Sequence, residues 1–399
     1  MSSERKVRLG IIGVGNIGST HFKSITEGKV EGLEVAAVAD RRPERLAWVK
    51  EYLDAKENEG VAVLRPVCFS EGSELIASGL CDAVIVSVPH YQHPGLSIDA
   101  MRHGLHVMCE KPAGVYTLQV REMMAEADLH PNLVFGMMFN QRTNPVYRKM
   151  REIIKSGELG QIRRTSWIVT DWYRPQYYYD SGDWRATWSG EGGGVLLNQC
   201  PHQLDLWQWI CGMPVLISAK MSFGKWHDIE VEDDVSVFCE YANGATGTFI
   251  TSTGDTPGTN RFEIVCDGGT LVAGSKSLTL YKLDTPEPEY SKNNREKVFG
   301  KPGCEKIDIT PEEPATGHVG VLRAFTGAIL RGEPLVADGR EGIFGLTISN
   351  AIHLSGFLGR EVKIPFDEEL FRGELMKRVA TSRRKTGGAS VTGDTEGTY

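Results

Sequence analysis

A short apolar segment that runs into a glycine-rich turn constrains this chain more than any other feature. Residues 7–12 are mostly apolar, and Gly13, Gly15 and Gly18 follow with the spacing Gly-x-Gly-x-x-Gly. In this pattern the first glycine permits a tight turn, the second lets the backbone approach a phosphate group, and the third lets a helix pack on the strand. The segment therefore predicts a buried parallel strand, a phosphate-binding turn and a helix.

A second apolar segment turns this weak pattern into a specific one. Residues 33–39 form another predicted strand, and Asp40 follows it about 20 residues after the third glycine, where an acid can bond the ribose diol of a dinucleotide. We therefore predict a dinucleotide site; the alternative is a structural glycine-rich turn without a ligand. The residues predicted for this site are Gly13, Gly15, Asn16, Ile17 and Asp40.

The residues after the second strand bear on which dinucleotide binds. The carboxylate of Asp40 would repel a 2′-phosphate, which favours NAD. Arg41 and Arg42 follow immediately and could instead bind the 2′-phosphate of NADP, or lie over the adenine. We expect NAD and keep NADP as the alternative.

The order of the expected elements predicts two domains and a tail. The chain has 399 residues, 41% of them hydrophobic, which is more than one ordinary core accommodates. Strands and helices alternate over residues 1–141, which predicts a doubly wound parallel sheet, the Rossmann arrangement. Strands with period-two alternation dominate residues 142–372, which predicts an α+β domain with a largely antiparallel sheet. Residues 373–399 are polar and typical of a tail that is mobile or wraps a partner.

Composition excludes several classes of protein. The net charge is −8, and no concentrated basic face points to a nucleic acid. We find no signal-peptide pattern and no apolar run long enough to span a membrane, so we expect a cytoplasmic protein without a membrane partner. The eight cysteines include no Cys-x-x-Cys pair, and the histidine pairs lack acidic or cysteine neighbours at ligand spacing. We therefore predict reduced thiols and no metal site.

Two segments carry candidate catalytic residues. Lys111 follows a predicted parallel strand at the edge where ligands bind in such sheets, and a desolvated lysine there can orient or deprotonate a hydroxyl. The alternative is a solvated surface lysine. The second segment contains three consecutive glycines, then His202 and Asp205 on one predicted helical face. A neutral histidine suits the removal of an alcohol proton; the alternative is a histidine that only pairs with Asp205.

A segment rich in tryptophan and tyrosine lies between these two, over residues 167–188. Flat rings can stack on the C–H faces of sugars while interleaved charged groups bond the hydroxyls, so we predict sugar contacts here. The alternative is a packed loop or a subunit contact, where the same residue types are enriched. The residues predicted to bind the substrate are Tyr173, Asp183, Trp184, Arg185 and Asn198.

These motifs resemble the glucose–fructose oxidoreductase and inositol dehydrogenase family, known as Gfo/Idh/MocA, over about residues 6–366. The motifs that carry the resemblance are Gly13–Gly18, Val88–His93, Glu110–Pro112, Trp184–Arg185, Gly192–Asp205 and Ile348–Ala351. The resemblance implies an NAD(P)-dependent dehydrogenase that acts on a secondary hydroxyl of a sugar, a cyclitol or a derivative. It also implies an open-faced C-terminal sheet whose flat side is buried in a homodimer or homotetramer.

The resemblance also implies roles for individual residues. Lys111 would hold and polarise the reacting hydroxyl, His202 would take its proton, and the peptide bond before Pro112 is often cis in the family. The resemblance adds four residues to the predicted cofactor site, namely Arg41, Pro89, His93 and Glu110.

The chain departs from the family pattern at Asn198, where many members carry an aspartate four residues before the histidine. Asparagine cannot accept a proton but can bond a substrate hydroxyl, and this variant is similar to members that oxidise C3 of pyranosides or sugar nucleotides. Two alternative functions stay open. One is glycoside cleavage by transient C3 oxidation, with a tyrosine from 173–179 as a further acid or base. The other is a non-catalytic, nucleotide-sensing regulator.

Overall fold

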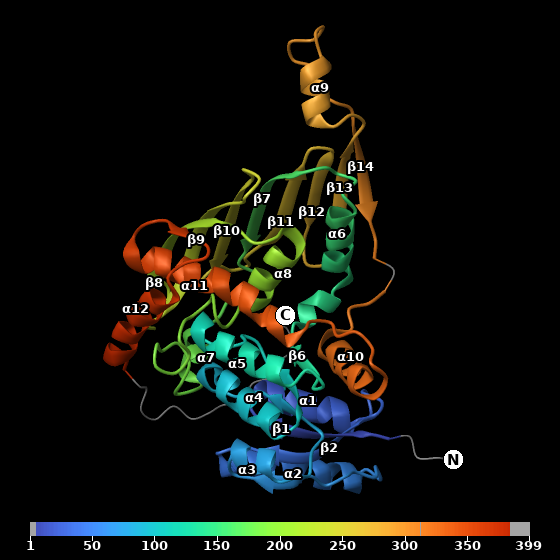
Figure 1. The fold of residues 1–399 in the computed structure, drawn as a ribbon, viewed down its shortest axis with the longest axis vertical. Helices are drawn as coiled ribbons and strands as arrows, with labels where there is room; N and C mark the ends of the chain where they lie inside the picture. Colours follow the sequence, from blue (N-terminus) through green and yellow to red (C-terminus); the bar gives the residue numbers. More distant parts are fainter. Residues whose placement is uncertain (1–4, 312, 384–399) are drawn as a thin grey trace.

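Two sheets at opposite ends of the molecule organise the computed structural model, which describes residues 5–311 and 313–383 (Figure 1). The first sheet is parallel throughout, with the strand order β3-β2-β1-β4-β5-β6. Its strands are β1 (Val7–Ile12), β2 (Leu33–Ala39), β3 (Val67–Phe69), β4 (Ala83–Val86), β5 (His106–Cys109) and β6 (Phe135–Met137). Its covering helices are α1 (Asn16–Thr26), α2 (Pro43–Asn58), α3 (Gly72–Ala77), α4 (His93–Arg102) and α5 (Thr117–Leu129).

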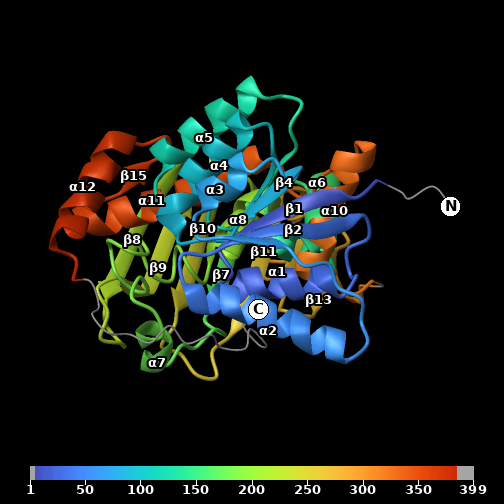
Figure 2. The ribbon, with the colours of Figure 1, turned by 90° about the horizontal axis from the view of Figure 1, so that it is seen from below.

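The helices cover both faces of this sheet, which confirms the predicted doubly wound Rossmann arrangement. Figure 2 shows α3, α4 and α5 on one face and α1 and α2 on the other. The strands are nearly continuous apolar segments because both faces are buried. The strand order reverses between the neighbours β1 and β4, so the loops at their carboxyl ends diverge and leave a crevice where ligands bind in such folds.

The second sheet has nine strands in the order β14-β13-β12-β11-β7-β10-β9-β8-β15. All neighbours pair antiparallel except β10 and β7, which confirms a largely antiparallel sheet. The strands are β7 (Ile162–Val169), β8 (Leu216–Phe223), β9 (Glu232–Glu240), β10 (Thr246–Ser252), β11 (Asn260–Cys266), β12 (Gly269–Ala273), β13 (Leu278–Leu283), β14 (Cys304–Ile309) and β15 (Val362–Lys363).

One face of the second sheet is covered and the other is open. The helices α6 (Pro145–Ser156), α8 (Pro201–Cys211) and α11 (Gly342–Leu358) pack together on the covered face (Figure 1). Side chains along the strands alternate accordingly, so Phe238 and Ile250 on the open face are 41% and 36% exposed. The open-faced sheet is therefore as expected, while burial of this face in an oligomer stays a prediction.

Helix α10 (Gly317–Arg331) returns to the first sheet although its residues lie in the range predicted for the second domain. It contacts α1 and β1, and its Leu322 and Phe325 share a buried cluster with Phe22. An amphipathic pattern identifies a helix that covers a core but does not say which core. This return brings the N-terminus of α10 to the dinucleotide half of the molecule.

The end of the described chain is helical where we expected a polar tail. Helix α12 (Glu368–Thr381) includes residues 373–381 and buries Phe371 and Leu375, while residues 384–399 of the expected tail lie outside the described residues. The remaining helices are α7 (Gln176–Asp180), α9 (Glu287–Asn293), η1 (His90–Gln92), η2 (Asn140–Thr143) and η3 (Gly339–Glu341). Among the helices of residues 5–383 that are described, none is long and apolar enough to cross a bilayer.

Candidate active site

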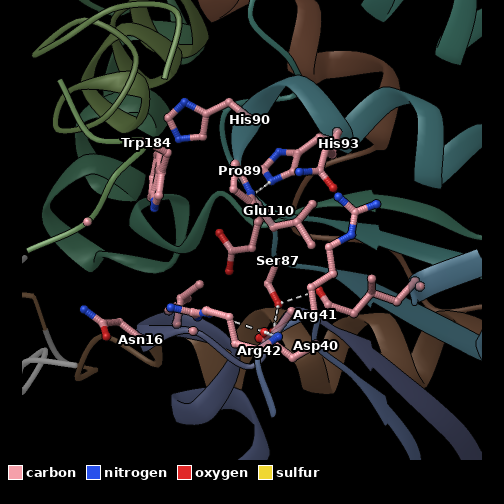
Figure 3. Close-up of a pocket in the computed structure, with 18 of the residues that line it drawn as sticks. Asn16, Asp40, Arg41, Arg42, Ser87, Pro89, His90, His93, Glu110 and Trp184 are labelled. Carbon is pink, nitrogen blue, oxygen red and sulfur yellow. Dashed lines mark hydrogen bonds and ion pairs between the residues drawn. The ribbon is translucent and has the colours of Figure 1, made fainter. Parts of the chain in front are cut away.

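A pocket of about 480 Å³ lies at the carboxyl edge of the parallel sheet. One wall comes from the β1–α1 turn and the loops after β2, β4 and β5, and the other comes from residues 174–199. Figure 3 shows Asp40, Arg41 and Arg42 at one end of the pocket and His90 and Trp184 at the other. In the part of the chain that is described, no group of three or more His, Cys, Asp or Glu side chains could hold a metal ion.

The glycine-rich turn has the geometry that a dinucleotide requires. Gly13 has a φ of +91°, which a residue with a side chain rarely adopts. A Cβ atom on Gly18 would lie 1.9 Å from the carbonyl oxygen of Gly13, so helix α1 packs against the turn only because residue 18 is glycine. A Cβ atom on Gly15 would meet no protein atom closer than 4.0 Å. The protein itself therefore leaves open space at Gly15, at the N-terminus of α1, where phosphate groups bind.

Asp40 is fixed at the end of β2 by two backbone groups. Its Oδ2 accepts a hydrogen bond from the Val14 N–H at 2.8 Å, and its Oδ1 accepts one from the Arg42 N–H at 3.0 Å. Arg41 turns to an ion pair with Glu71 at 2.9 Å, although both residues line the pocket. A fixed carboxylate at this position suits a ribose diol, so these residues fit NAD.

Three further residues predicted for the cofactor line the pocket and are held in place by buried contacts. Pro89 lies in the wall, and both ring nitrogens of His93 lie 2.7 Å from backbone carbonyl oxygens. Glu110 lies 2.7 Å from the ring of buried His21. Burial alone would raise the pKa of Glu110, but the hydrogen bond from His21 and the nearby positive charges lower it overall. Glu110 is therefore a buried carboxylate beside the cofactor site.

Lys111 joins the two walls of the pocket. It follows β5, the bond to Pro112 is cis, and its Nζ donates a hydrogen bond of 2.8 Å to the carbonyl oxygen of Asn198. Both residues line the pocket. An ammonium group from the nucleotide half therefore lies against the segment that precedes helix α8.

His202 differs from the expectation because its side chain is not part of the pocket wall. It is 1% exposed in the first turn of α8, and its ring packs edge-on against Phe139. Burial, then the charges of Lys111 and His318, keep the pKa of His202 well below its usual value, so the imidazole is neutral. Asp205, the partner in the alternative interpretation, binds Arg142 through two hydrogen bonds of 2.7 Å.

Glu191 and His318 escaped the sequence analysis as site residues, and Tyr178 was included only as one of several tyrosines. The Tyr178 hydroxyl donates to Asn198 Oδ1 at 3.1 Å, and Asn198 Nδ2 donates to Glu191. Glu191 is buried, which raises its pKa to about 7. His318, at the start of α10, lines the pocket, and burial lowers its pKa to about 4. Glu191 could have been identified from its position immediately before the three glycines. Nothing in the sequence indicates that His318 lies at this pocket.

The three consecutive glycines bring the Asn198 segment against strand β9. A Cβ atom on Gly194 would lie 2.1 Å from the carbonyl oxygen of Glu232. The Glu232 side chain accepts hydrogen bonds from the N–H groups of Gly194 and Leu196 at 2.8 and 3.0 Å, and its other oxygen lies 3.1 Å from buried His353. These contacts fix the backbone that presents Asn198 to Lys111.

The aromatic segment divides between the pocket and the core. Asp183, Trp184 and Arg185 line the pocket. Tyr173 does not, because its side chain points to solvent and is 47% exposed. Trp167 is a core residue, stacked on Phe262 with ring centroids 4.1 Å apart. Residue type alone could not separate these roles, because each depends on where the loop after β7 leaves the sheet.

Both halves of the chain are similar to proteins of a known family. Residues 7–137 match a model described as an oxidoreductase family with an NAD-binding Rossmann fold, and residues 147–272 match the GFO/IDH/MocA C-terminal domain. A myo-inositol 2-dehydrogenase of Thermotoga maritima is 24% identical over 366 residues, which cover 90% of this chain and 98% of that protein. A trans-1,2-dihydrobenzene-1,2-diol dehydrogenase of Bos taurus is 29% identical over 248 residues, covering 62% of this chain and 68% of the relative.

A solved structure resembles almost the whole chain. The WlbA dehydrogenase of Chromobacterium violaceum, in complex with NADH and UDP-GlcNAcA, has a TM-score of 0.74 and 26% identity, covering 92% of this chain and 98% of the other. Its similarity extends over both sheets, so the relation of the two halves is shared as well as each half.

Proposed function

Because this chain belongs to the Gfo/Idh/MocA family of NAD-dependent oxidoreductases, we propose that it transfers hydride between NAD and the carbon that bears a secondary hydroxyl group in a sugar or sugar derivative. The contact between Lys111 Nζ and the Asn198 carbonyl oxygen carries this proposal, since it puts an ammonium group between the dinucleotide wall and the substrate wall. Relatives named as dehydrogenases of inositol and of a dihydrodiol support a hydroxyl-bearing ring as the substrate.

NAD would be held by the turn at Gly13–Ile17 and by Asp40, and it supplies the hydride acceptor for oxidation. The protein's own contribution begins with Lys111. Its ammonium group can donate a hydrogen bond to the reacting hydroxyl and stabilise the negative charge that develops when the proton leaves. The neighbouring Asn198 can bond an adjacent hydroxyl and so orient the ring.

We propose His202 as the final proton acceptor. Its neutral imidazole can take a proton, and Lys111 is near enough to lower its pKa. Because His202 lies behind the wall, the proton would pass through the Lys111 ammonium group, which gives one proton to His202 as it receives another. His318 is the competing acceptor, since it lines the pocket. A larger loss of kcat in His202→Asn than in His318→Asn supports His202, and the reverse assigns the role to His318.

The test of the overall reaction is a panel of polyols and sugars assayed for NADH absorbance. Turnover of at least one sugar or cyclitol with NAD is the expected result. Tight NAD binding without turnover on any member would overturn the proposal and favour a nucleotide-sensing regulator.

We further propose C3 of a pyranoside as the oxidised carbon, because Asn198 stands where an acid–base aspartate is common in the family. Substrates deuterated at C3 and at C2 separate the possibilities. Deuterium transfer to the cofactor from C3 alone, with a slower rate for that isotopologue, is the expected result. Transfer from another carbon would contradict the assignment.

Redox-neutral glycoside cleavage is the second candidate, and Tyr178 is the observation that favours it. Its hydroxyl lies between the Arg185 guanidinium at 2.8 Å and Asn198 at 3.1 Å, so a further acid or base is available beside the substrate wall. Release of the aglycone with no net NADH formation would identify this reaction, while NADH formation in proportion to sugar consumed identifies the dehydrogenase.

A further inference from the structure

Two arginines in the substrate wall make their hydrogen bonds to neutral groups among the described residues. Arg174 and Arg185 both line the pocket. Arg174 Nη1 donates to the backbone carbonyl groups of Trp172 and Tyr173, and Arg185 Nη1 donates to the Tyr178 hydroxyl. Across residues 5–311 and 313–383, neither guanidinium has a carboxylate within ion-pair distance, whereas Arg142, for example, binds two. Neutral acceptors satisfy hydrogen bonds but leave the positive charge uncompensated.

Aromatic contacts place both guanidinium groups against the same tyrosine ring. The Arg185 guanidinium carbon lies 4.6 Å from the centroid of the Tyr178 ring and 4.7 Å from that of Trp184, and the Arg174 carbon lies 5.3 Å from the same Tyr178 ring. Such stacking orients the planar donor groups before a ligand arrives. The buried Nε of Arg174 also has no hydrogen-bond acceptor among the described residues.

Nearby acids offset only part of this charge. Asp183 lines the pocket without an ion pair to either arginine among the described residues. Burial raises the pKa of Glu191 to about 7, although the nearby charge of Arg185 acts to lower it. Lys111 adds a third cation to the same end of the pocket. The substrate end therefore carries more positive than negative charge.

The adenine half of the dinucleotide does not account for these arginines. Its phosphate groups belong at the start of α1 and its adenine ribose at Asp40, both on the opposite wall. Trp184 lies at the end of the pocket away from Asp40 (Figure 3). Trp184 packs edge-on against His90 with ring centroids 5.5 Å apart, so this end of the pocket is where the nicotinamide end of the dinucleotide and the second ligand would meet.

We propose that the substrate is a sugar that carries an anionic group, a carboxylate or a phosphate, which Arg174 and Arg185 bind. This inference rests on the proposed function and names the substrate class for that site. Paired guanidinium donors match the oxygen atoms of a carboxylate or phosphate, and such charge-assisted bonds are stronger than bonds to neutral hydroxyls.

The test compares a neutral sugar with its anionic counterparts: methyl glucoside, methyl glucuronide and glucose 6-phosphate, and the same set built on galactose. We expect kcat/KM for one anionic form to exceed that of its neutral counterpart about tenfold or more. The carboxylate and phosphate arms identify which group the site takes. Arg174→Gln and Arg185→Gln should each lower kcat/KM for that anionic sugar about tenfold more than for its neutral counterpart. Arg163→Gln is the matched control, because Arg163 pairs with Glu287 on the exposed surface.

Two results would overturn the inference. One is equal or better use of the neutral sugars. The other is that both arginine substitutions weaken NAD binding and leave the preference for the anionic sugar unchanged. Calorimetric binding of the same sugars in the presence of NADH separates this inference from the proposed function. Tighter binding of an anionic sugar without its oxidation refutes the function alone, while oxidation of neutral sugars without an anion preference refutes the inference alone.

Discussion

The two walls of the pocket are built in different ways. The cofactor wall uses backbone geometry within one short turn, Gly13–Gly18, and a carboxylate at the end of the next strand. The substrate wall uses side chains from residues 174–199, together with Lys111 and His318 from distant parts of the chain. The cofactor wall tolerates few substitutions but can be predicted from the sequence. The substrate wall sets specificity through contacts that cannot be predicted from the sequence.

The walls also differ in how they treat charge. On the cofactor side, Asp40 and Glu110 are carboxylates stabilised by hydrogen bonds. On the substrate side, burial raises the pKa of Glu191 to about 7 and lowers the pKa of His202. Perturbed groups of this kind gather where protons are exchanged. Substitutions on the two walls should therefore have different effects.

Replacing Lys111, which joins the walls, should have the largest effect. In Lys111→Met we expect kcat/KM for the best sugar to fall about 1,000-fold, or about 4 kcal/mol, because the hydroxyl loses its charged hydrogen-bond donor. NADH formation measures this loss. NAD binding should stay within a factor of about three, since Lys111 contacts the substrate wall. Lys149→Met, at an exposed ion pair with Glu152, is the control and should change nothing.

Glu191 should make folding stability depend on pH. Its pKa is raised to about 7 in the folded state from an ordinary value of 4.5. Between these values the folded protein binds more protons than the unfolded chain, so stability is fully present below pH 4.5 and falls as pH rises to about 7. The loss should be about 3 kcal/mol. Measuring Tm from pH 4.5 to 8 in the wild type and in Glu191→Gln isolates the contribution of this carboxyl group. If Tm changes with pH in the same way in both proteins, the pKa of Glu191 is not raised.

Two glycines of the cofactor wall should fail in different ways when replaced by alanine. Gly18→Ala should lower the free energy of unfolding by about 2 kcal/mol or more, because its Cβ would lie 1.9 Å from the Gly13 carbonyl oxygen. Gly15→Ala should leave Tm unchanged, since residue 15 has a φ of −72° and open space around it, yet raise the Kd for NAD about tenfold. Thermal unfolding measures the stability of both variants, and calorimetry measures their Kd for NAD. Unchanged NAD binding in Gly15→Ala would remove the ligand explanation for that space.

The smallest predicted effect concerns the choice of dinucleotide. Asp40→Asn keeps an oxygen for the Val14 N–H but removes the charge that repels a 2′-phosphate. We expect the ratio of kcat/KM for NADP to that for NAD to rise about tenfold. Glu44→Gln, at an exposed position in the first turn of α2, is the control. An unchanged ratio would mean that Arg41 or Arg42 decides the choice.

Much of the fold was predictable because it follows from local patterns. Strands β1 and β2 have the predicted bounds, and the Rossmann half and the antiparallel sheet are as expected. The departures have a common cause. Helix α10 covers the first sheet, α12 occupies part of the expected tail, and the His202 ring turns to the core. The sequence predicts the helices that carry His202 and α10 but not the surface on which each packs, which depends on distant residues. It does not predict α12, whose polar sequence buries only Phe371 and Leu375.

By itself, the sequence determined the cofactor turn, the position of Lys111 after a parallel strand, and the alternation that builds each sheet. These depend on steric limits within a few residues of one another. The tertiary structure alone decided that Glu191 and Tyr178 meet at Asn198, that His318 lines the same pocket, and that Arg174 and Arg185 bind neutral groups among the described residues. Such proximity, and the burial that shifts a pKa, arise when segments far apart in the chain exclude water together.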